Sequence, residues 1–446
     1  MTDSRLAATA ALLWLAFVAI VYLPVAGQGF VKDDFAWVAA AARVQPQPES
    51  VFLADSSGTF YRPMVTLSFL ADLSLYGLHA RGYGLTNILL MTACAAGIVL
   101  LFRTLGIGIA AATAGALVWT ANPHAVNMAV LWISGRTSLL MTVLSCLSVV
   151  AFLRSWRIAG TLLFLGALLS KEDALAVPVL VLAIGWLVQA RRPSSLGVDL
   201  ALMALTVGAY AWVRLGTNAI DPANAPSFYR LTSDPSLILR NLVAYLDRSA
   251  TGAAVIAFVA ALAYRARPVF TTRDRRLLVV ALVWFLAGLA ITVRVPVRSS
   301  LYALFPSVGA ALAFAVTIEA LRRPQENRSR DRLLAAALGL PLVLTPVYYA
   351  RSDRWVDPAR VSASAVVQLQ ADAAALPESG VVVFEDSAEQ YANFRDVFGP
   401  LSAESVRLVT GKSLDAVVLP PGDMREVPGQ VARYRVDGFQ VGRVAP

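Results

Sequence analysis

Long apolar runs alternate with short polar loops from residue 7 to about residue 350 of the chain. A run of about 18–22 residues is long enough for a helix to cross a hydrocarbon core of roughly 30 Å. The period-two alternation of a barrel strand is absent. We therefore predict an α-helical polytopic membrane protein with about eleven transmembrane helices. The predicted spans cover about residues 7–26, 85–102, 107–122, 137–153, 158–169, 174–190, 196–214, 249–264, 277–293, 301–320 and 333–349.

Arginines gather in alternate loops between these predicted spans. Cytoplasmic loops carry an excess of Lys and Arg, so the arginine-rich loops mark the inner side of the membrane. This places the N-terminus in the cytoplasm and the last 95 or so residues outside. The first apolar run is too long for a cleaved secretory signal, so we predict an uncleaved first helix. The marking residues include Arg103, Arg154, Arg157, Arg191, Arg192, Arg273, Arg275, Arg276, Arg322 and Arg323.

The first outer loop, residues 28–84, has mixed polarity and contains a short apolar stretch, 63–78. Asp72 and several hydroxyls interrupt that stretch, and Pro63 suits the first turn of a helix. We predict a helix that lies in the membrane interface. A tilted transmembrane span is the alternative, and it would invert the orientation of everything that follows.

The remaining residues, 351–446, have a different pattern from the first 350. Residues 381–384 and 416–419 are typical of buried strands, and 431–441 of a terminal strand or hairpin. Residues 359–376 have the pattern of an amphipathic helix. We therefore predict two parts, a transmembrane domain over residues 1–350 and a small extracytoplasmic α/β domain over residues 351–446.

The composition supports a membrane protein and argues against nucleic-acid binding. The chain is 57% hydrophobic and 15% charged, whereas soluble proteins carry about 25% charged residues. The net charge of +9 comes from arginines in inner loops rather than from a basic surface. Cys94 and Cys146 both fall in apolar runs and indicate neither a disulfide framework nor a metal site. Nucleotide-binding and soluble-hydrolase motifs are absent, which argues against an ATP-driven pump.

Charged residues on the outer side are not explained by the loop-charge rule. Ionisable groups near hydrocarbon are costly, about 2.5–3.5 kcal/mol each at mid-bilayer, and usually mark function or pair with one another. The charged residues predicted on the outer side are Lys32, Asp33, Asp34, Arg62, Asp72, Arg136, Lys171, Glu172, Asp173 and Arg298.

The adjacent carboxylates Asp33 and Asp34 are the catalytic candidates. One can act as general base on an acceptor hydroxyl while the other accepts structural hydrogen bonds. An ordinary solvated loop is the alternative interpretation, and a carboxylate pair could also hold a divalent ion.

Cations on the same side are candidates for binding a phosphate. Arg62 and Arg136 could grip it through their planar guanidinium groups, and Lys171 could act as a point charge. Snorkelling arginines, or a Lys171–Glu172 pair, would explain the same residues without a ligand. The remaining candidates for substrate binding are Glu172, His124, Arg298 and Tyr302.

Short motifs in chain order resemble the GT-C superfamily of multi-span glycosyltransferases. The likeness is to the protein O-mannosyltransferase-like branch, which includes the transmembrane-and-tetratricopeptide mannosyltransferases, although no such repeats are present here. The motifs are Asp33-Asp34, Tyr61-Arg62-Pro63-Met64, Tyr76-Gly77-Leu78, Gly82-Tyr83-Gly84-Leu85-Thr86-Asn87, Asn122-Pro123-His124, Trp132-Ile133-Ser134-Gly135-Arg136, Leu169-Ser170-Lys171-Glu172 and Arg298 through Tyr302 to Pro306.

The resemblance implies an inverting hexosyltransferase in a bacterial-type plasma membrane. It would move a sugar from a polyprenyl-phosphate-linked donor to a protein, lipid or glycan acceptor on the extracytoplasmic side. Asp33 or Asp34 would be the acid/base, and Arg62, Arg136, Lys171 and Arg298 would lie near the phosphate or sugar. A transporter or flippase of a lipid-linked saccharide is the alternative, but it should carry charges at mid-membrane and matched broken spans. A membrane-anchored assembly protein is a third possibility.

Overall fold

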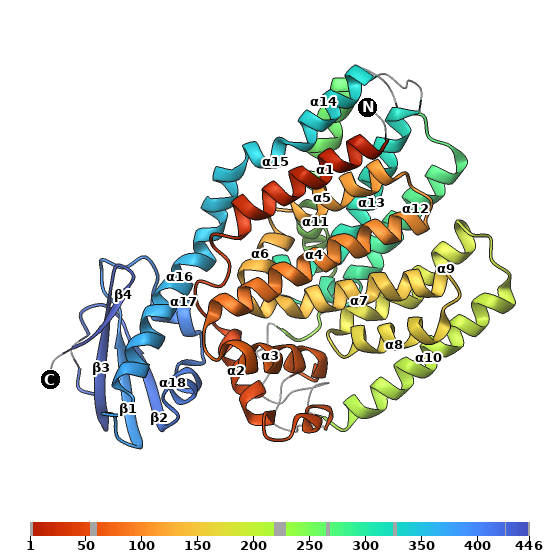
Figure 1. The fold of residues 1–446 in the computed structure, drawn as a ribbon. Coiled ribbons are helices and arrows are strands. Elements are labelled where there is room, and N and C mark those ends of the chain that lie inside the picture. Colours follow the sequence, from red (N-terminus) through yellow and green to blue (C-terminus); the bar gives the residue numbers. More distant parts are fainter. Residues whose placement is uncertain are drawn as a thin grey trace.

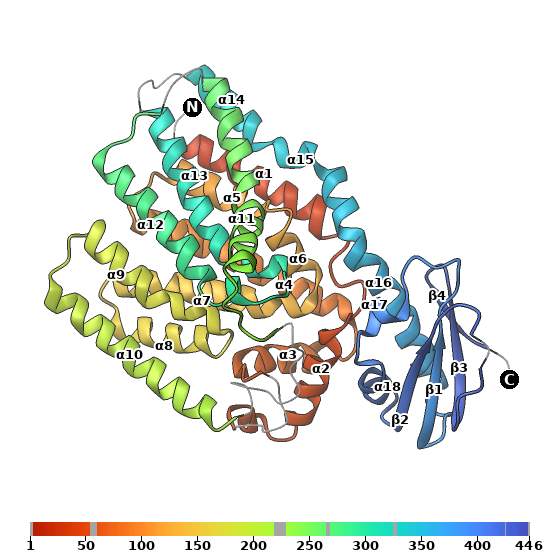
Figure 2. The same cartoon turned by 180° about the vertical axis from the view of Figure 1, so that it is seen from behind.

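A bundle of long helices carries a small sheet at one end (Figure 1). The structure is a computed structural model that describes residues 3–53, 60–217, 229–264, 268–323, 328–423 and 425–444. The bundle helices of the first half are α1 (Asp3–Phe17, continued by a π-helical turn, Val18–Tyr22), α4 (Ala80–Thr104), α5 (Ile109–Thr120), α7 (Arg136–Leu153), α8 (Arg157–Leu168), α9 (Val177–Leu187) and α10 (Pro193–Leu215). Those of the second half are α11 (Pro235–Tyr264), α12 (Thr272–Leu289), α13 (Pro306–Arg322), α14 (Arg328–Leu338), α15 (Leu340–Val343) and α16 (Thr345–Asp372). Seen from behind, α11 and α12 flank α13 (Figure 2).

Each predicted span coincides with one or more of these helices. Among the described residues, six helical segments are long and apolar enough to cross a membrane by length and composition, so the chain is an integral membrane protein. The count of eleven spans stays a prediction. The predicted span 333–349 is divided among α14, α15 and the start of α16. Pro341 and Pro346, which have no amide hydrogen, lie in the first turns of α15 and α16.

Shorter helices and turns surround the bundle end nearest the sheet. The described residues between 28 and 79 include the helices α2 (Asp33–Val44) and α3 (Pro63–Tyr76), and α3 has the bounds predicted for the interfacial helix to within two residues. Its 14 residues, like the 12 of α5 and the 12 of α8, are fewer than the about 20 of a full-length span. The other short elements are the 3-10 turn Pro48–Phe52, α6 (Ala125–Leu131) and the 3-10 turns Ile133–Gly135, Glu172–Ala176, Thr292–Arg294 and Ser300–Ala303.

The C-terminal sheet has the strands β1 (Ser379–Glu385), β2 (Ser413–Leu419), β3 (Gln430–Asp437) and β4 (Gln440–Arg443) in the order β2-β1-β3-β4. β1 pairs in parallel with β2 and β3, and β4 closes an antiparallel hairpin with β3. These strands coincide with the predicted apolar runs. The predicted helix 359–376 overlaps α16, which begins 14 residues earlier than expected, ends four residues earlier, and runs from the bundle to the sheet. Two short helices, α17 (Phe394–Phe398) and α18 (Ser402–Thr410), were not predicted.

One hydrophobic core joins α2 and α3 to the C-terminal sheet. Phe35 of α2 packs on Phe398 of α17 with ring centroids 5.6 Å apart, and the Lys32 N–H donates to the Val397 carbonyl at 2.7 Å. Gly84 lets α4 approach the turn at Gly27, because a Cβ at Gly84 would lie 2.4 Å from the Gly27 nitrogen. These contacts position the start of α2 against both parts of the chain.

Candidate active site

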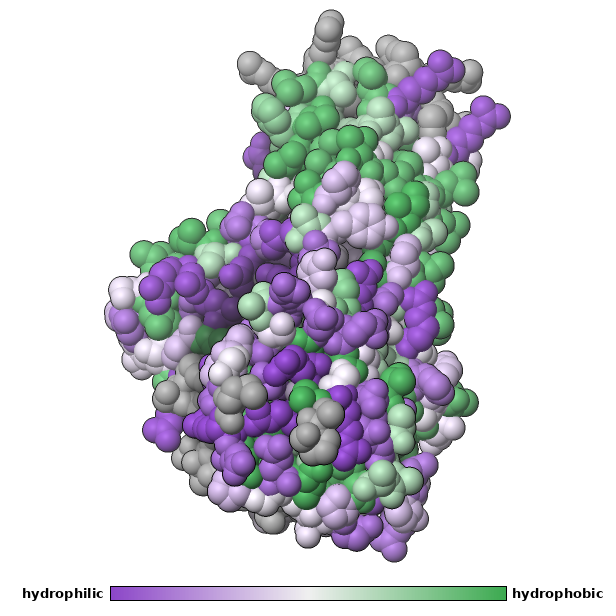
Figure 3. Space-filling model, turned by 90° about the vertical axis from the view of Figure 1, so that its left-hand side faces the viewer, coloured by the Kyte–Doolittle hydropathy of each residue, from purple (hydrophilic) through white to green (hydrophobic). Residues whose placement is uncertain are grey.

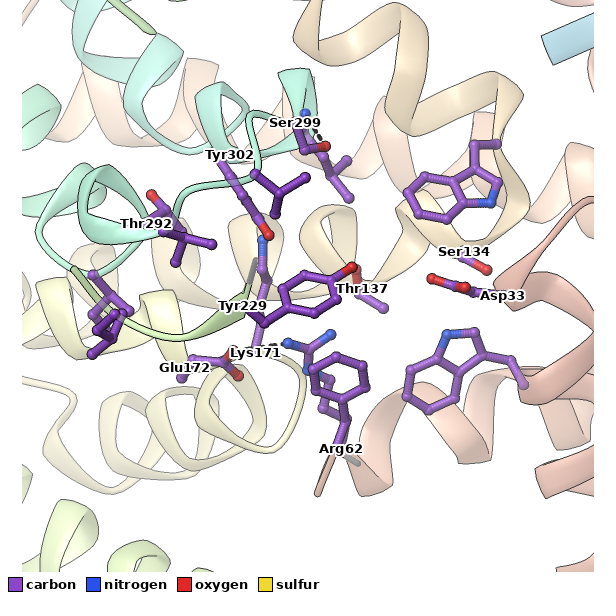
Figure 4. A pocket seen from close by; sticks show the side chains of 18 of the residues that line it. Asp33, Arg62, Ser134, Thr137, Lys171, Glu172, Tyr229, Thr292, Ser299 and Tyr302 are labelled. Atoms are coloured by element: carbon purple, nitrogen blue, oxygen red, sulfur yellow. Dashed lines mark hydrogen bonds and ion pairs between the residues drawn. The ribbon is translucent and has the colours of Figure 1, made fainter. Parts of the chain in front are cut away.

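A cavity of about 640 Å³ lies where the start of α2 faces the ends of α7, α8 and α10. Its lining comes from segments that are far apart in the sequence, so only the fold brings them together. Figure 4 shows Asp33 on one side of this first cavity, Lys171 and Glu172 on the other, and Arg62 between them in that view. The lining residues are Asp33, Trp37, Phe60, Arg62, Trp132, Ser134, Thr137, Lys171, Glu172, Arg214, Tyr229, Arg230, Leu231, Ile291, Thr292, Val295, Val297, Ser299, Leu301 and Tyr302.

Asp33 and Asp34 are the first two residues of α2, and their side chains have different surroundings. Successive residues are turned by about 100° around a helix axis, so two neighbours cannot share one environment. The Asp34 carboxylate is fully buried and accepts hydrogen bonds from the Val31 N–H (2.8 Å), the Ser134 N–H (2.7 Å) and the Ser134 hydroxyl. Burial raises the pKa of Asp34 to about 7, and these hydrogen bonds oppose the rise. Asp34 therefore joins the start of α2 to the turn before α7.

Of the two aspartates, Asp33 is the one that lines the first cavity. Burial raises the pKa of Asp33, and the positive charges of Lys32 and Arg62 act in the opposite direction. A carboxylate with a raised pKa is a stronger proton acceptor than a solvated one, which suits a general base. Both oxygens of Asp34 are turned to Val31 and Ser134, so the pair does not present two carboxylates to one ion. Within the described ranges, no three His, Cys, Asp or Glu side chains gather as a metal site.

Arg62 and Glu172 form an ion pair at the cavity wall, with Arg62 Nη2 and Glu172 Oε1 2.8 Å apart. Burial acts to raise the pKa of Glu172, but the charges of Arg62 and Arg214 outweigh it and lower this pKa to about 2. The same attraction outweighs burial for Arg62 and raises its pKa, so both groups are charged. Arg62 Nε is buried and has no hydrogen-bond partner among the described residues. This N–H donor is therefore not used within the described part of the chain.

Lys171 is 4% exposed, yet it lines the same cavity. Its Nζ donates to the Ser138 hydroxyl at 3.0 Å, lies 2.9 Å from Asp173 Oδ2 and sits 5.0 Å from the centroid of the Tyr302 ring. Lys171 therefore pairs with Asp173, whereas the expected alternative was a pair with Glu172. The ammonium group is held in place between α7, the Glu172–Ala176 turn and Tyr302.

Arg136 does not reach the first cavity. It is fully buried, with Nη2 2.6 Å from Asp72 Oδ2 and 3.1 Å from the Tyr83 carbonyl oxygen, and it donates from Nε to Asn87 Oδ1 at 3.2 Å. These contacts join α3, α4 and α7. We expected Arg136 to bind a phosphate, but its guanidinium nitrogens already contact groups inside the protein.

Arg298 and His124 are also placed away from the first cavity. Arg298 lines a second cavity. His124 precedes α6, and its Nδ1 lies 2.9 Å from Arg351 Nη2. Burial and the charge of Arg351 lower the pKa of His124 to about 4, so the ring is neutral at physiological pH and accepts from Arg351.

Several lining residues were not predicted as candidates. Arg214 ends α10, and Glu172 Oε2 lies 3.6 Å from its Nη1. The loop-charge rule could have singled out Arg214, because the rule does not explain an arginine at the predicted outer end of the span 196–214. Ser134 stands inside the Trp132–Arg136 motif, but no property of that motif indicates that its hydroxyl and N–H meet Asp34. Tyr229 and Thr137 carry no recognisable signal in the sequence.

The arrangement of the helices is similar to that of a GT-C glycosyltransferase of known structure. The chain is similar to ArnT from Cupriavidus metallidurans, a member of that class, in a crystal structure bound to undecaprenyl phosphate, with a TM-score of 0.57 and 15% identity over 93% of this chain and 86% of ArnT. The apo state of ArnT gives a TM-score of 0.55 and 13% identity over 91% of this chain and 85% of ArnT. No family model and no curated protein matches the chain. The likeness establishes the GT-C fold, and the O-mannosyltransferase-like branch stays a prediction.

Proposed function

We propose that this protein transfers a sugar from a polyprenyl-phosphate carrier to an acceptor hydroxyl, with inversion at the anomeric carbon. The observation that carries the proposal is the first cavity, which is lined by the carboxylate of Asp33 and by the cations Arg62 and Lys171. The GT-C fold supports it, since ArnT in the same fold binds undecaprenyl phosphate. The ordered motifs of residues 33–306 favour a hexose, as in the O-mannosyltransferase-like branch.

Asp33 is the general base of the proposed reaction. Its carboxylate accepts the proton of the acceptor hydroxyl as the oxygen attacks the anomeric carbon. The bond between that carbon and the phosphate oxygen breaks, and its electron pair leaves with the carrier phosphate. Asp34, whose oxygens are bound by Val31 and Ser134, holds the first turn of α2 in position and takes no proton from the acceptor.

Arg62 and Lys171 stabilise the departing phosphate. Negative charge grows on the phosphate as the sugar leaves, so fixed positive charge aimed at it lowers the barrier. Each cation is held by a carboxylate partner, Glu172 for Arg62 and Asp173 for Lys171. The partner fixes the position of each cation in advance, and both cations line the cavity that would receive the phosphate. This arrangement can supply the charge stabilisation through side chains alone.

The active site lies on the extracytoplasmic side in this proposal. Arg154 and Arg157 flank the turn between α7 and α8, whereas Arg136, which starts α7, and Lys171, which follows α8, lie at the other ends of these helices. Arginine-rich turns belong on the cytoplasmic side. A carrier lipid used on the outer side needs no nucleotide.

The test is sugar transfer by the purified protein in liposomes that contain radiolabelled undecaprenyl-phosphate hexoses, with a bacterial membrane fraction as the acceptor source. We expect Asp33→Asn to lower transfer by about 10²–10⁴-fold, the usual contribution of a general base. Asp437→Asn, which changes an exposed aspartate of β3, is the matched control and should keep full activity. Full transfer by Asp33→Asn would refute the assignment. Movement of the intact donor between leaflets without cleavage of the sugar–phosphate bond would identify a flippase instead.

A further inference from the structure

A second cavity of about 620 Å³ adjoins the first and lies between the bundle and the C-terminal sheet. Both cavities are lined by Val297 and Ser299. Lys32 lines the second cavity, whereas the next residue, Asp33, lines the first. The face of the molecule that carries the sheet is largely hydrophilic and hollowed above the sheet, and apolar surface continues over the helices beyond (Figure 3). A ligand in the second cavity would therefore lie beside the proposed base.

Two stacked tryptophans stand between the cavities. Trp132 lines the first cavity and Trp355 the second, and their rings are 5.2 Å apart at an interplanar angle of 12°. The indole N–H of Trp132 donates to the Val31 carbonyl at 3.4 Å. Trp355 Nε1 is buried and has no hydrogen-bond partner within the described part of the chain. Buried indole N–H groups usually have a partner, so this donor suits a polar ligand.

A second aromatic ring faces the same cavity. Tyr391 is 67% exposed and stacks on Phe439 with ring centroids 4.2 Å apart, and it lines the cavity together with Trp355. Aromatic rings offer a flat apolar face, and the polar groups around them fix orientation. The C–H face of a pyranose ring matches such a platform, and the carboxylates of Asp353, Asp357 and Asp396 in the lining can accept from its hydroxyls.

Arginines of the second cavity lack carboxylate partners. Across the described segments, none of Arg248, Arg298 and Arg354 forms an ion pair within 4.0 Å. Arg248 Nη1 is buried without a hydrogen-bond partner in those segments. Arg248, Arg298 and Arg354 line the same cavity, so their like charges repel one another. An anion between them would satisfy the Arg248 donor and relieve this repulsion.

We propose that the second cavity is the acceptor site and that its ligand is a saccharide carrying an anionic group, a phosphate or a carboxylate. The inference rests on the proposed function. The sugar ring stacks on Trp355, the anionic group meets Arg248 and its neighbouring arginines, and a hydroxyl reaches past the Trp132–Trp355 pair to Asp33. The donor phosphate is held separately by Arg62 and Lys171 in the first cavity.

The test is binding of small sugars to the full chain in detergent, measured by saturation-transfer NMR. Glucose 1-phosphate and galacturonate are the anionic probes, which distinguish phosphate from carboxylate, and glucose is the neutral comparison. We expect at least one anionic probe to bind about tenfold more tightly than glucose, as one charge-assisted hydrogen bond implies. Trp355→Ala should weaken binding of all three sugars, and Arg248→Gln should abolish the preference for the anionic probe. Trp355→Phe, which keeps a stacking ring but loses the indole N–H, should retain part of the binding.

Trp156→Ala is the matched control, because Trp156 is 58% exposed in the turn between α7 and α8 and Arg154 lies 5.4 Å from its ring centroid. It should not change binding. Equal binding of glucose and both anionic probes, or binding that survives Trp355→Ala and Arg248→Gln, would overturn the inference. So would an anionic signal lost in Lys171→Ala alone, since the probe would then occupy the first cavity. Trp355-dependent binding of a serine-rich peptide, without binding of the sugars, would assign a protein acceptor instead.

The two proposals fail separately in these experiments. If Asp33→Asn keeps full transfer while the sugars bind through Trp355 and Arg248, the proposed base is wrong and the saccharide site stands. If Asp33→Asn loses transfer while Arg248→Gln leaves both sugar binding and the KM for acceptor unchanged, the acceptor site is wrong and the transferase stands.

Discussion

Arg62 Nη2 donates to Glu172 Oε1 at 2.8 Å, which joins residues that are 110 positions apart in the chain. The pair connects the residue before α3 to the turn before α9, and the Met64 N–H donates to the Leu169 carbonyl at 3.2 Å beside it. It therefore fixes a cation of the proposed site relative to both the outer segment and the bundle. The predictions below separate the residues that act on substrate from those that hold this arrangement.

Arg62→Gln should shift the acid limb of the pH–activity profile to higher pH. Asp33 must be ionised to accept a proton, so activity falls as the pH drops through its raised pKa. The charge of Arg62 lowers that pKa, and its removal raises it further. The measurement is kcat/KM against pH, with Arg43→Gln as a surface control because Arg43 is exposed and its partner is Glu404. An unchanged or downward-shifted limb would contradict the role of Asp33.

Asp34→Asn should flatten the pH dependence of thermal stability. In the folded protein the pKa of Asp34 is raised to about 7 from 3.8, so the folded state holds this proton more tightly than the unfolded chain. Its stabilising contribution is full below the unfolded value and is lost as the pH rises through about 7. The measurement is the difference in Tm between wild type and Asp34→Asn from pH 4 to pH 8. The same slope in both proteins would show that Asp34 does not titrate in this range.

Arg136→Gln should unfold the bundle end rather than impair substrate binding. The change leaves Asp72, which is 3% exposed, as a buried carboxylate without its cation. Breaking a buried ion pair costs about 3–5 kcal/mol, and replacing both partners by apolar residues costs much less. Tm should therefore fall sharply in Arg136→Gln and partly recover in Arg136→Met/Asp72→Leu. If the Arg136→Gln protein is stable and binds the donor more weakly, Arg136 binds the donor and its role is not structural.

Lys171→Ala/Asp173→Ala removes the ammonium group without leaving its buried carboxylate partner unpaired. It should weaken binding of undecaprenyl phosphate by about 10–100-fold, since a hydrogen bond to a charged group contributes roughly 1.5–3 kcal/mol. Arg298→Ala is the matched comparison, because Arg298 lines only the second cavity. It should leave the affinity for the lipid phosphate unchanged. The measurement is titration of the protein in detergent with undecaprenyl phosphate. Equal effects of the two variants would argue against separate donor and acceptor cavities.

Hydrophobic patterning was sufficient to predict the helical bundle and the strands. An apolar run must be helical in a bilayer whatever its neighbours are, so local sequence decides the element. The predicted strands at 381–384 and 416–419 lie within β1 and β2 for a similar reason, since short β-branched runs favour a buried parallel pair. The length of α16 was missed because Pro358 lies inside it, and a proline within a helical pattern usually marks a helix boundary.

The sequence by itself determined the membrane class, the positions of the helices and the short set of charged residues from which a site could be built. Only the tertiary structure decided which of them face one cavity. Asp33 and Asp34 are chemically identical neighbours, and the contact of Asp34 with Ser134, 100 positions away, leaves Asp33 to the cavity. Arg136 and Lys171 both lie at a helix end. Asp72 and its neighbours enclose Arg136, whereas Lys171 lines the first cavity. Burial and ion pairing depend on partners that are remote in the chain, and no local pattern contains them.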